Sequence, residues 1–125
     1  MPVDQTRQRR ACGWLSTGLA GFSVEMDGFT WSMEELLSAH ELQVEGGIMQ
    51  HCVGTYTKYC LNGSASIWSM RVMQGEQKKR VLTVEICPVS KRVVQAQGKR
   101  NTRPTATAYR MLKRWAANQN VEMNF

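Results

Sequence analysis

The sequence predicts a single α+β domain, in which a small antiparallel meander of three to five strands carries two or three helices packed on one face. Three segments, 66–73, 80–87 and 92–97, alternate apolar and polar residues with the two-residue period of a strand. Two others, 48–61 and 105–118, repeat apolar residues every three or four positions, as amphipathic helices do. The length of 125 residues fits one hydrophobic core.

The alternation assigns a face of the sheet to each side chain of the meander. The apolar face would hold Trp68, Met70 and Val72, then Leu82, Val84 and Ile86, then Val94 and Ala96. The opposite face would hold Ser69 and Arg71, then Thr83 and Glu85, then Gln95 and Gln97. We expect the two amphipathic helices to cover the apolar face, which leaves a polar array on the other side.

The segment before the meander predicts a hairpin and then a short helix. Residues 22–31 have the pattern of two short strands joined by an Asp27-Gly28 turn. Ser32 and Glu35 have the spacing of a capping box, which predicts that a helix begins there and runs to about residue 39. Ser38 could restart this helix.

The helix at 48–61 is bounded by glycines. Gly46-Gly47 is expected to interrupt helicity before it, and Asn62-Gly63 to end it. Its apolar members are Met49, Cys52, Val53, Tyr56 and Cys60. The second helix, at 105–118, follows Pro104 in a position that a first helical turn tolerates, and it should bury Tyr109, Leu112, Trp115 and Ala116.

The composition bounds the class of protein. Hydrophobic residues make up 42% of the chain and charged residues 21%, which excludes a wholly disordered protein. No stretch approaches the roughly 18 consecutive apolar residues of a membrane span, and the polar start has no apolar signal segment. We therefore expect a cytoplasmic protein with no membrane partner, organised as a basic, mobile arm at 1–12 and one domain at 13–125.

The whole chain has a formal net charge of +6, and its positive charge is concentrated in the last third. Such a patch with interspersed aromatic residues is the footprint expected for a phosphate backbone. The alternative is a solvated helix face that pairs with the acidic segment at 22–45 of the same molecule. The candidate nucleic-acid-binding residues are Lys99, Arg100, Arg103, Arg110, Lys113 and Arg114.

The four cysteines are Cys12, Cys52, Cys60 and Cys87. No pair has the C-x-x-C spacing of a metal knuckle, and nothing indicates a secreted protein that would need disulfides. We therefore expect buried, reduced thiols, with no metal and no cofactor.

The polar array offers groups that could do chemistry. Arg71 can fork onto a phosphate or carboxylate, and Glu85 can act as an acid or base or hold Arg71. His51 is the strongest candidate for proton transfer near neutral pH. The loop from Gly98 to Asn101 could bring backbone N–H groups to an anion. The alternative is an ordinary solvated sheet face with a surface ion pair.

The run from Glu45 to Tyr56 resembles the E-G-x-x-M-x-H-C-V-x-x-Y core of PcfJ-like domains. The resemblance continues through a T-x-E element at 83–85 and a Q-x-x-G-x-x-N element at 95–101, and it covers about residues 38–115. PcfJ-like domains occur in conjugative plasmids, phages and other mobile elements. The resemblance implies a family-defining set of His51, Cys52, Tyr56, Arg71, Glu85, Gln95 and Asn101.

Three functions fit these observations. The first is a mobile-element protein that binds, and in one version processes, nucleic acid. The second is an enzyme acting on a nucleotide-like phosphorylated molecule, with His51, Glu85, Arg71 and, less favoured, a Cys52 nucleophile as catalytic residues. Its ligand would meet Tyr56, Ser69, Thr83, Gln95, Gly98 and Asn101. The third is a small, non-catalytic basic protein that inhibits a host nucleoprotein or defence complex.

Overall fold

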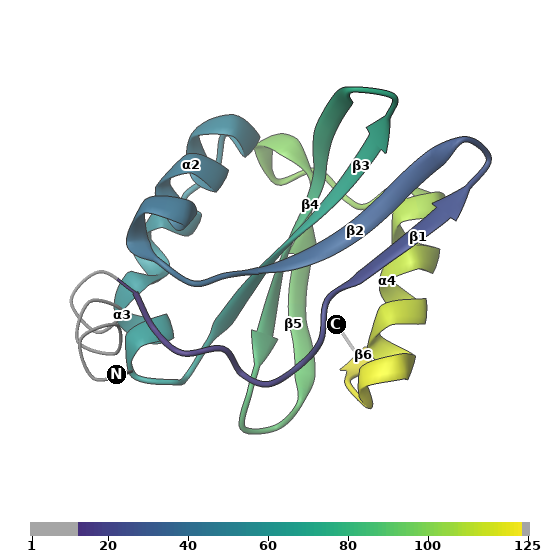
Figure 1. The fold of residues 1–125 in the computed structure, drawn as a ribbon. Coiled ribbons are helices and arrows are strands. Elements are labelled where there is room, and N and C mark those ends of the chain that lie inside the picture. Colours follow the sequence, from purple (N-terminus) through teal and green to yellow (C-terminus); the bar gives the residue numbers. More distant parts are fainter. Residues whose placement is uncertain (1–12, 124–125) are drawn as a thin grey trace, which may run out of the picture.

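The computed structural model describes residues 13–123, which form one curled sheet with helices on both sides (Figure 1). The strands follow one another across the sheet in chain order. They are β1 (Phe22–Met26), β2 (Phe29–Leu36), β3 (Ser66–Gln74), β4 (Gln77–Cys87), β5 (Arg92–Gln97) and β6 (Glu122–Met123). The first five strands pair antiparallel, and β6 runs parallel to β5. The α+β class is confirmed, but the expected limit of five antiparallel strands is wrong, because β6 adds a parallel sixth strand. The predicted arm at 1–12 lies outside the described residues.

The helices lie on opposite faces of this sheet, so the expectation that they share one face is wrong (Figure 1). They are α2 (Ala39–Met49), the 3-10 turn η1 (Val53–Tyr56), α3 (Thr57–Leu61), the 3-10 turn η2 (Lys99–Asn101) and α4 (Ala106–Gln119). Within residues 13–123, none of them combines the length and the apolar character that crossing a bilayer requires.

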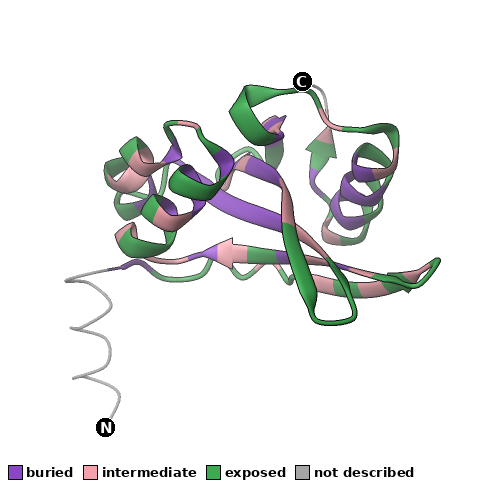
Figure 2. Ribbon diagram, turned by 90° about the horizontal axis from the view of Figure 1, so that it is seen from above, coloured by how far each residue is buried: buried purple, intermediate pink, exposed green. Residues whose placement is uncertain are grey.

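One apolar cluster lies on each face of the sheet. On the α4 side, Trp115 and Leu112 pack against Trp68, Met70 and the buried side chains of β4. On the α2 side, a smaller cluster gathers Leu36, Leu42, Val53, Cys60 and Ile67. Figure 2 shows buried positions on the central strands and on the inward sides of the helices. The apolar face of the meander therefore belongs to α4, while α2, η1 and α3 cover the face that carries the polar array.

Residues 29–36 form a strand where a capping box predicted a helix. The segment pairs along its length with β3, which buries Met33 and Leu36 to 2% and 1% exposure. Glu35 does not cap a helix, since its carboxylate accepts hydrogen bonds from Ser16 and Ser66. The burial that pairing provides outweighs a local capping preference.

The helix α2 begins at the alternative start that the sequence offered. Ser38 is its N-cap and accepts a hydrogen bond from the backbone N–H of Glu41 (3.1 Å). Gly46 and Gly47 lie inside this helix, so the expected interruption there is wrong. The helix ends instead at Gln50, whose φ of 56° is left-handed. The predicted helix at 48–61 is consequently split into the end of α2, η1 and α3.

A register shift between β4 and β5 corrects one assignment of faces. A shift between Glu85 and Ile86 places Val93 opposite Ile86, so Val93 is buried while Val94 is 42% exposed. The expectation that Val94 faces the core is therefore wrong. Tyr109 on α4 was also expected to be buried, and it is 40% exposed.

The two adjacent glycines of α2 have opposite surroundings, which gives a first prediction. A Cβ on Gly46 would lie 3.0 Å from the backbone oxygen of His51, whereas a Cβ on Gly47 would meet nothing within 4 Å. We expect Gly47→Ala to raise the free energy of unfolding by about 0.5–1 kcal/mol, the usual gain in an open helix. Gly46→Ala should lower it, because the backbone at His51 would have to move. Urea unfolding of both variants measures the two signs, and a stabilised Gly46→Ala would contradict this packing.

Candidate functional site

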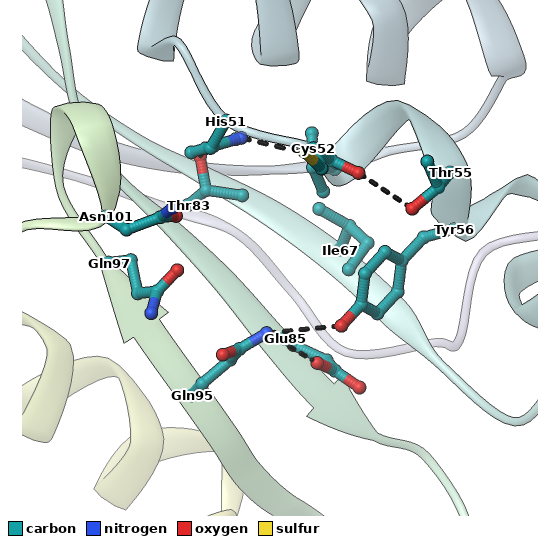
Figure 3. A pocket seen from close by; sticks show the side chains of 11 residues that line it. His51, Cys52, Thr55, Tyr56, Ile67, Thr83, Glu85, Gln95, Gln97 and Asn101 are labelled. Carbon is teal, nitrogen blue, oxygen red and sulfur yellow. Dashed lines mark hydrogen bonds between the residues drawn. The ribbon is translucent and has the colours of Figure 1, made fainter.

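A pocket of about 170 Å³ opens between the end of α2, η1 and the polar face of β4 and β5 (Figure 3). Its walls hold seven of the predicted site residues, namely His51, Cys52, Tyr56, Thr83, Glu85, Gln95 and Asn101. They come from a helix end, a 3-10 turn, two strands and a loop, which are brought together because α2 and η1 lie on the polar face of the sheet. The structure therefore gathers most of the predicted site in one concavity.

His51 is held by a chain of hydrogen bonds that ends in an ion pair. Its Nε2 lies 2.8 Å from Thr83 Oγ1, and the Thr83 hydroxyl donates to Glu45 Oε2 at 2.5 Å. The other Glu45 oxygen accepts a hydrogen bond from Arg80 Nη1 at 2.6 Å. Because the single hydroxyl proton of Thr83 goes to Glu45, Thr83 must accept from His51, which places a proton on Nε2.

The other nitrogen of His51 is then free to exchange a proton with a ligand. Nδ1 accepts only a long contact, 3.4 Å, from the backbone N–H of Val53. An N–H donor at this position requires a lone pair on Nδ1, so the hydrogen-bond network assigns the neutral Nε2–H tautomer.

Glu45 is the most unusual charged residue of the domain, and sequence analysis did not select it for the site. Glu45 is 0% exposed, while the side chain of its partner Arg80 is 19% exposed. A register shift between Met70 and Arg71 turns Arg80 toward α2 and makes the pair possible. One signal was readable, because Glu45 lies between Leu42 and Met49 on the buried side of its helix. The register shift had no readable signal.

A second network lines the wall of the pocket formed by η1, β4 and β5. The side-chain amide of Gln95 donates to Tyr56 Oη at 3.2 Å and to Glu85 Oε1 at 3.0 Å. Burial, followed by the charge of Glu85, raises the pKa of Tyr56 above its ordinary value, although the hydrogen bond from Gln95 lowers it. Tyr56 therefore remains a hydroxyl donor well above neutral pH. Gln97, which sequence analysis left out of the candidate site, lies beside this network in Figure 3.

Arg71 and Ser69 lie on the same face of the sheet but do not line the pocket. Arg71 Nη1 pairs with Glu34 at 3.3 Å, and its Nε donates to Ser69 Oγ at 3.1 Å. Ser69 is the register partner of Thr83, so Arg71 is linked to the strand position next to the pocket without being part of its wall. The guanidinium of Arg71 is thus held by Glu34 and Ser69, outside the lining that contains His51.

The loop after β5 also differs from expectation. The N–H of Gly98 donates to Thr102 O at 2.7 Å, and that of Asn101 donates to Gly98 O at 3.1 Å. These two groups are used inside the loop and are not available to bind an anion. Asn101 contributes its side chain to the pocket wall instead, and Arg100 ties the loop to α2 through a 2.6 Å hydrogen bond to Gln50.

The basic candidates divide into two groups. Lys99, Arg100 and Arg103 lie on or beside η2, next to the pocket, while Arg110, Lys113 and Arg114 are exposed on α4. The acidic segment at 22–45 pairs with Arg71 and Arg80 among the described residues. The intramolecular alternative for the C-terminal charge therefore gains no ion pair from residues 13–123.

The thiols that the structure describes are free cysteines in three different environments, and Cys12 lies outside the described residues. Cys52 is exposed at the pocket, where the two ring nitrogens of His51 face Thr83 and Val53. Burial raises the pKa of the Cys60 thiol to about 11, whereas hydrogen bonds with Ser90 lower the pKa of Cys87. Within residues 13–123, no three acidic, histidine or cysteine side chains converge as they do around a metal ion.

The fold and the site together define a class: a small α+β domain with a histidine-containing pocket on the helix-covered polar face of its sheet. The family described as PcfJ-like protein matches residues 4–111. This match covers most of the chain, and the protein belongs to the PcfJ-like family. No curated protein and no solved structure matches it.

Proposed function

We propose that this chain is a mobile-element protein that binds nucleic acid or a nucleotide-like phosphorylated ligand, with one nucleoside unit in the pocket. The observation that carries the proposal is the lining of the pocket. Amide side chains of Gln95 and Gln97 lie across the pocket from His51, and Asn101 lies beside Thr83 (Figure 3). Glu85 lies near Gln95 and Tyr56. Such paired donors and acceptors suit the edge of a nucleobase or the hydroxyls of a sugar.

The size of the pocket favours one unit of a ligand. Its volume of about 170 Å³ is below the roughly 300–1,000 Å³ of pockets that enclose drug-sized molecules. Glu85 would repel a phosphate placed beside it, but it can accept hydrogen bonds from a base amino group. We therefore place the base or sugar inside and the phosphates outside, toward Lys99, Arg100 and Arg103, where the local charge is positive.

The arrangement also supports a processing role for His51. Thr83, itself bonded to Glu45, fixes the ring through Nε2, so Nδ1 is the nitrogen that would take a proton from a ligand hydroxyl or water and return it. Cys52 is a weaker candidate, because the hydrogen bonds of His51 run to Thr83 and Val53 and not to its thiol.

The test is equilibrium binding of nucleotides and short labelled oligonucleotides, measured by fluorescence anisotropy over a range of salt concentrations. We expect binding that weakens as salt rises, and His51→Ala and Gln95→Ala should each weaken it about tenfold, as the loss of a good polar contact does. His40→Ala is the matched control, since His40 is the other histidine of the chain and is exposed on α2.

Absence of any nucleotide or oligonucleotide binding at low salt would refute the proposal. So would binding that is insensitive to both pocket variants. A stoichiometric host protein partner whose binding survives both substitutions would instead establish the non-catalytic interaction protein.

A further inference from the structure

The pocket does not stand alone, because two further hollows share its walls. One hollow, of about 400 Å³, is lined by Thr55, Tyr56 and Glu85 together with Tyr59. The first three of these residues also line the central pocket. The two cavities therefore adjoin each other at these residues of η1 and β4.

The other hollow lies on the opposite side of the central pocket. It measures about 550 Å³ and is lined by Gln95, Gln97 and Asn101 together with Arg103 and Tyr109. The first three of these residues again belong to the central pocket as well. The three cavities thus adjoin one another from α3, across β5, to the start of α4.

Each end of this groove carries the same pair of groups. Tyr59 is 42% exposed, with Lys58 Nζ over its ring at 5.2 Å from the centroid and the Tyr56 ring edge-on at 5.7 Å. Tyr109 is 40% exposed, with Lys113 Nζ 5.9 Å from its ring centroid. Exposed aromatic rings beside cations are how proteins hold single strands, because any base can stack on the ring while the cation meets the phosphate.

We infer that the groove binds a single-stranded nucleic acid over three consecutive nucleotides, the outer two stacking on Tyr59 and Tyr109. This inference rests on the proposed function, in which the middle nucleotide enters the pocket at His51. A duplex would not fit, because its bases are stacked on one another and cannot reach either ring. Three nucleotide positions follow from the three hollows, and Arg103 lines the hollow that contains Tyr109.

The experiment measures anisotropy of fluorescein-labelled oligothymidylate and oligouridylate of one, two, three and six nucleotides, with a hairpin duplex alongside. Affinity should rise with length up to three nucleotides and then level off, and the duplex should bind more weakly. Tyr59→Ala and Tyr109→Ala should each weaken trinucleotide binding about 5- to 150-fold, the usual effect of losing one stacked base. The DNA and RNA series together identify which sugar is preferred.

The controls separate stacking from folding. Tyr59→Phe and Tyr109→Phe keep the ring and should keep the affinity. Phe29→Ala is the matched aromatic control, since Phe29 is 37% exposed at the far β1–β2 turn. Lys58→Met should reduce the slope of log affinity against log salt by about 0.7, the contribution of one phosphate contact to a single strand.

The outcomes distinguish this inference from the proposed function. Mononucleotides that bind as tightly as trinucleotides, or tyrosine variants that leave trinucleotide binding unchanged, would overturn the three-nucleotide groove while leaving the pocket in place. Equal binding of the duplex would also overturn it. If neither mononucleotides nor oligonucleotides bind, the proposed function fails and the inference fails with it.

Discussion

Glu45→Ala should lower the free energy of unfolding by about 3–5 kcal/mol, the usual cost of removing one member of a buried ion pair. Glu45 is fully buried, and its two oxygens accept hydrogen bonds from Arg80 and Thr83. Without it, the Arg80 guanidinium would face α2 with no counter-charge, and the Thr83 hydroxyl would lose its acceptor. Urea unfolding followed by tryptophan fluorescence measures the change.

Two variants control for this expectation. Glu34→Ala breaks the pair with Arg71, but Glu34 retains 49% side-chain exposure, and loss of such a surface pair should cost under about 1 kcal/mol. Glu45→Gln keeps the size of the side chain and one acceptor, so its loss should fall between the two alanine variants. A Glu45→Ala protein as stable as Glu34→Ala would show that the buried pair does not support α2.

The meander and α4 were predictable because their signals are local and agree with their packing. The alternation in 66–73, 80–87 and 92–97 sets strands β3, β4 and β5 to within a few residues, and the apolar stripe at 105–118 coincides with α4. The face that α2 covers was not predictable in the same way. Its buried side includes Glu45, so the helix looks polar where it is in fact buried.

The site was predictable to the extent that it depends on which face a side chain occupies. Thr83, Glu85 and Gln95 follow from strand alternation, and all three line the pocket. Alternation gives no position along a strand, however, and Arg71, on the same face, is not part of the pocket lining. The support of His51 by Glu45 and Arg80 depends on a register shift between two strands, which is a property of the pairing and not of either segment alone.

The α4 side of the sheet gives the other large effect. Trp115→Ala should lower the free energy of unfolding by about 3–5 kcal/mol, as large-to-small changes of buried aromatic residues do. Trp115 is 0% exposed, its ring centroid lies 4.9 Å from that of Trp68, and its Nε1 donates to Ala20 O at 2.7 Å. The substitution would remove a large buried contact that holds α4 against the sheet, together with the hydrogen bond to Ala20. Urea unfolding followed by far-ultraviolet circular dichroism measures the loss.

The neighbouring Arg114→Ala provides the control, because Arg114 is exposed on the same helix and such a change should fall within about 0.5 kcal/mol. A loss below about 1 kcal/mol for Trp115→Ala, well short of a buried-tryptophan effect, would contradict the packing of α4.

The Trp115→Ala and Glu45→Ala substitutions should differ in their effect on mononucleotide binding. The pocket at His51 is built from α2, η1, β4 and β5, so Trp115→Ala protein that remains folded in the cold should still bind a mononucleotide there. Glu45→Ala should weaken that binding even when folded, because it releases Thr83 and the histidine ring together.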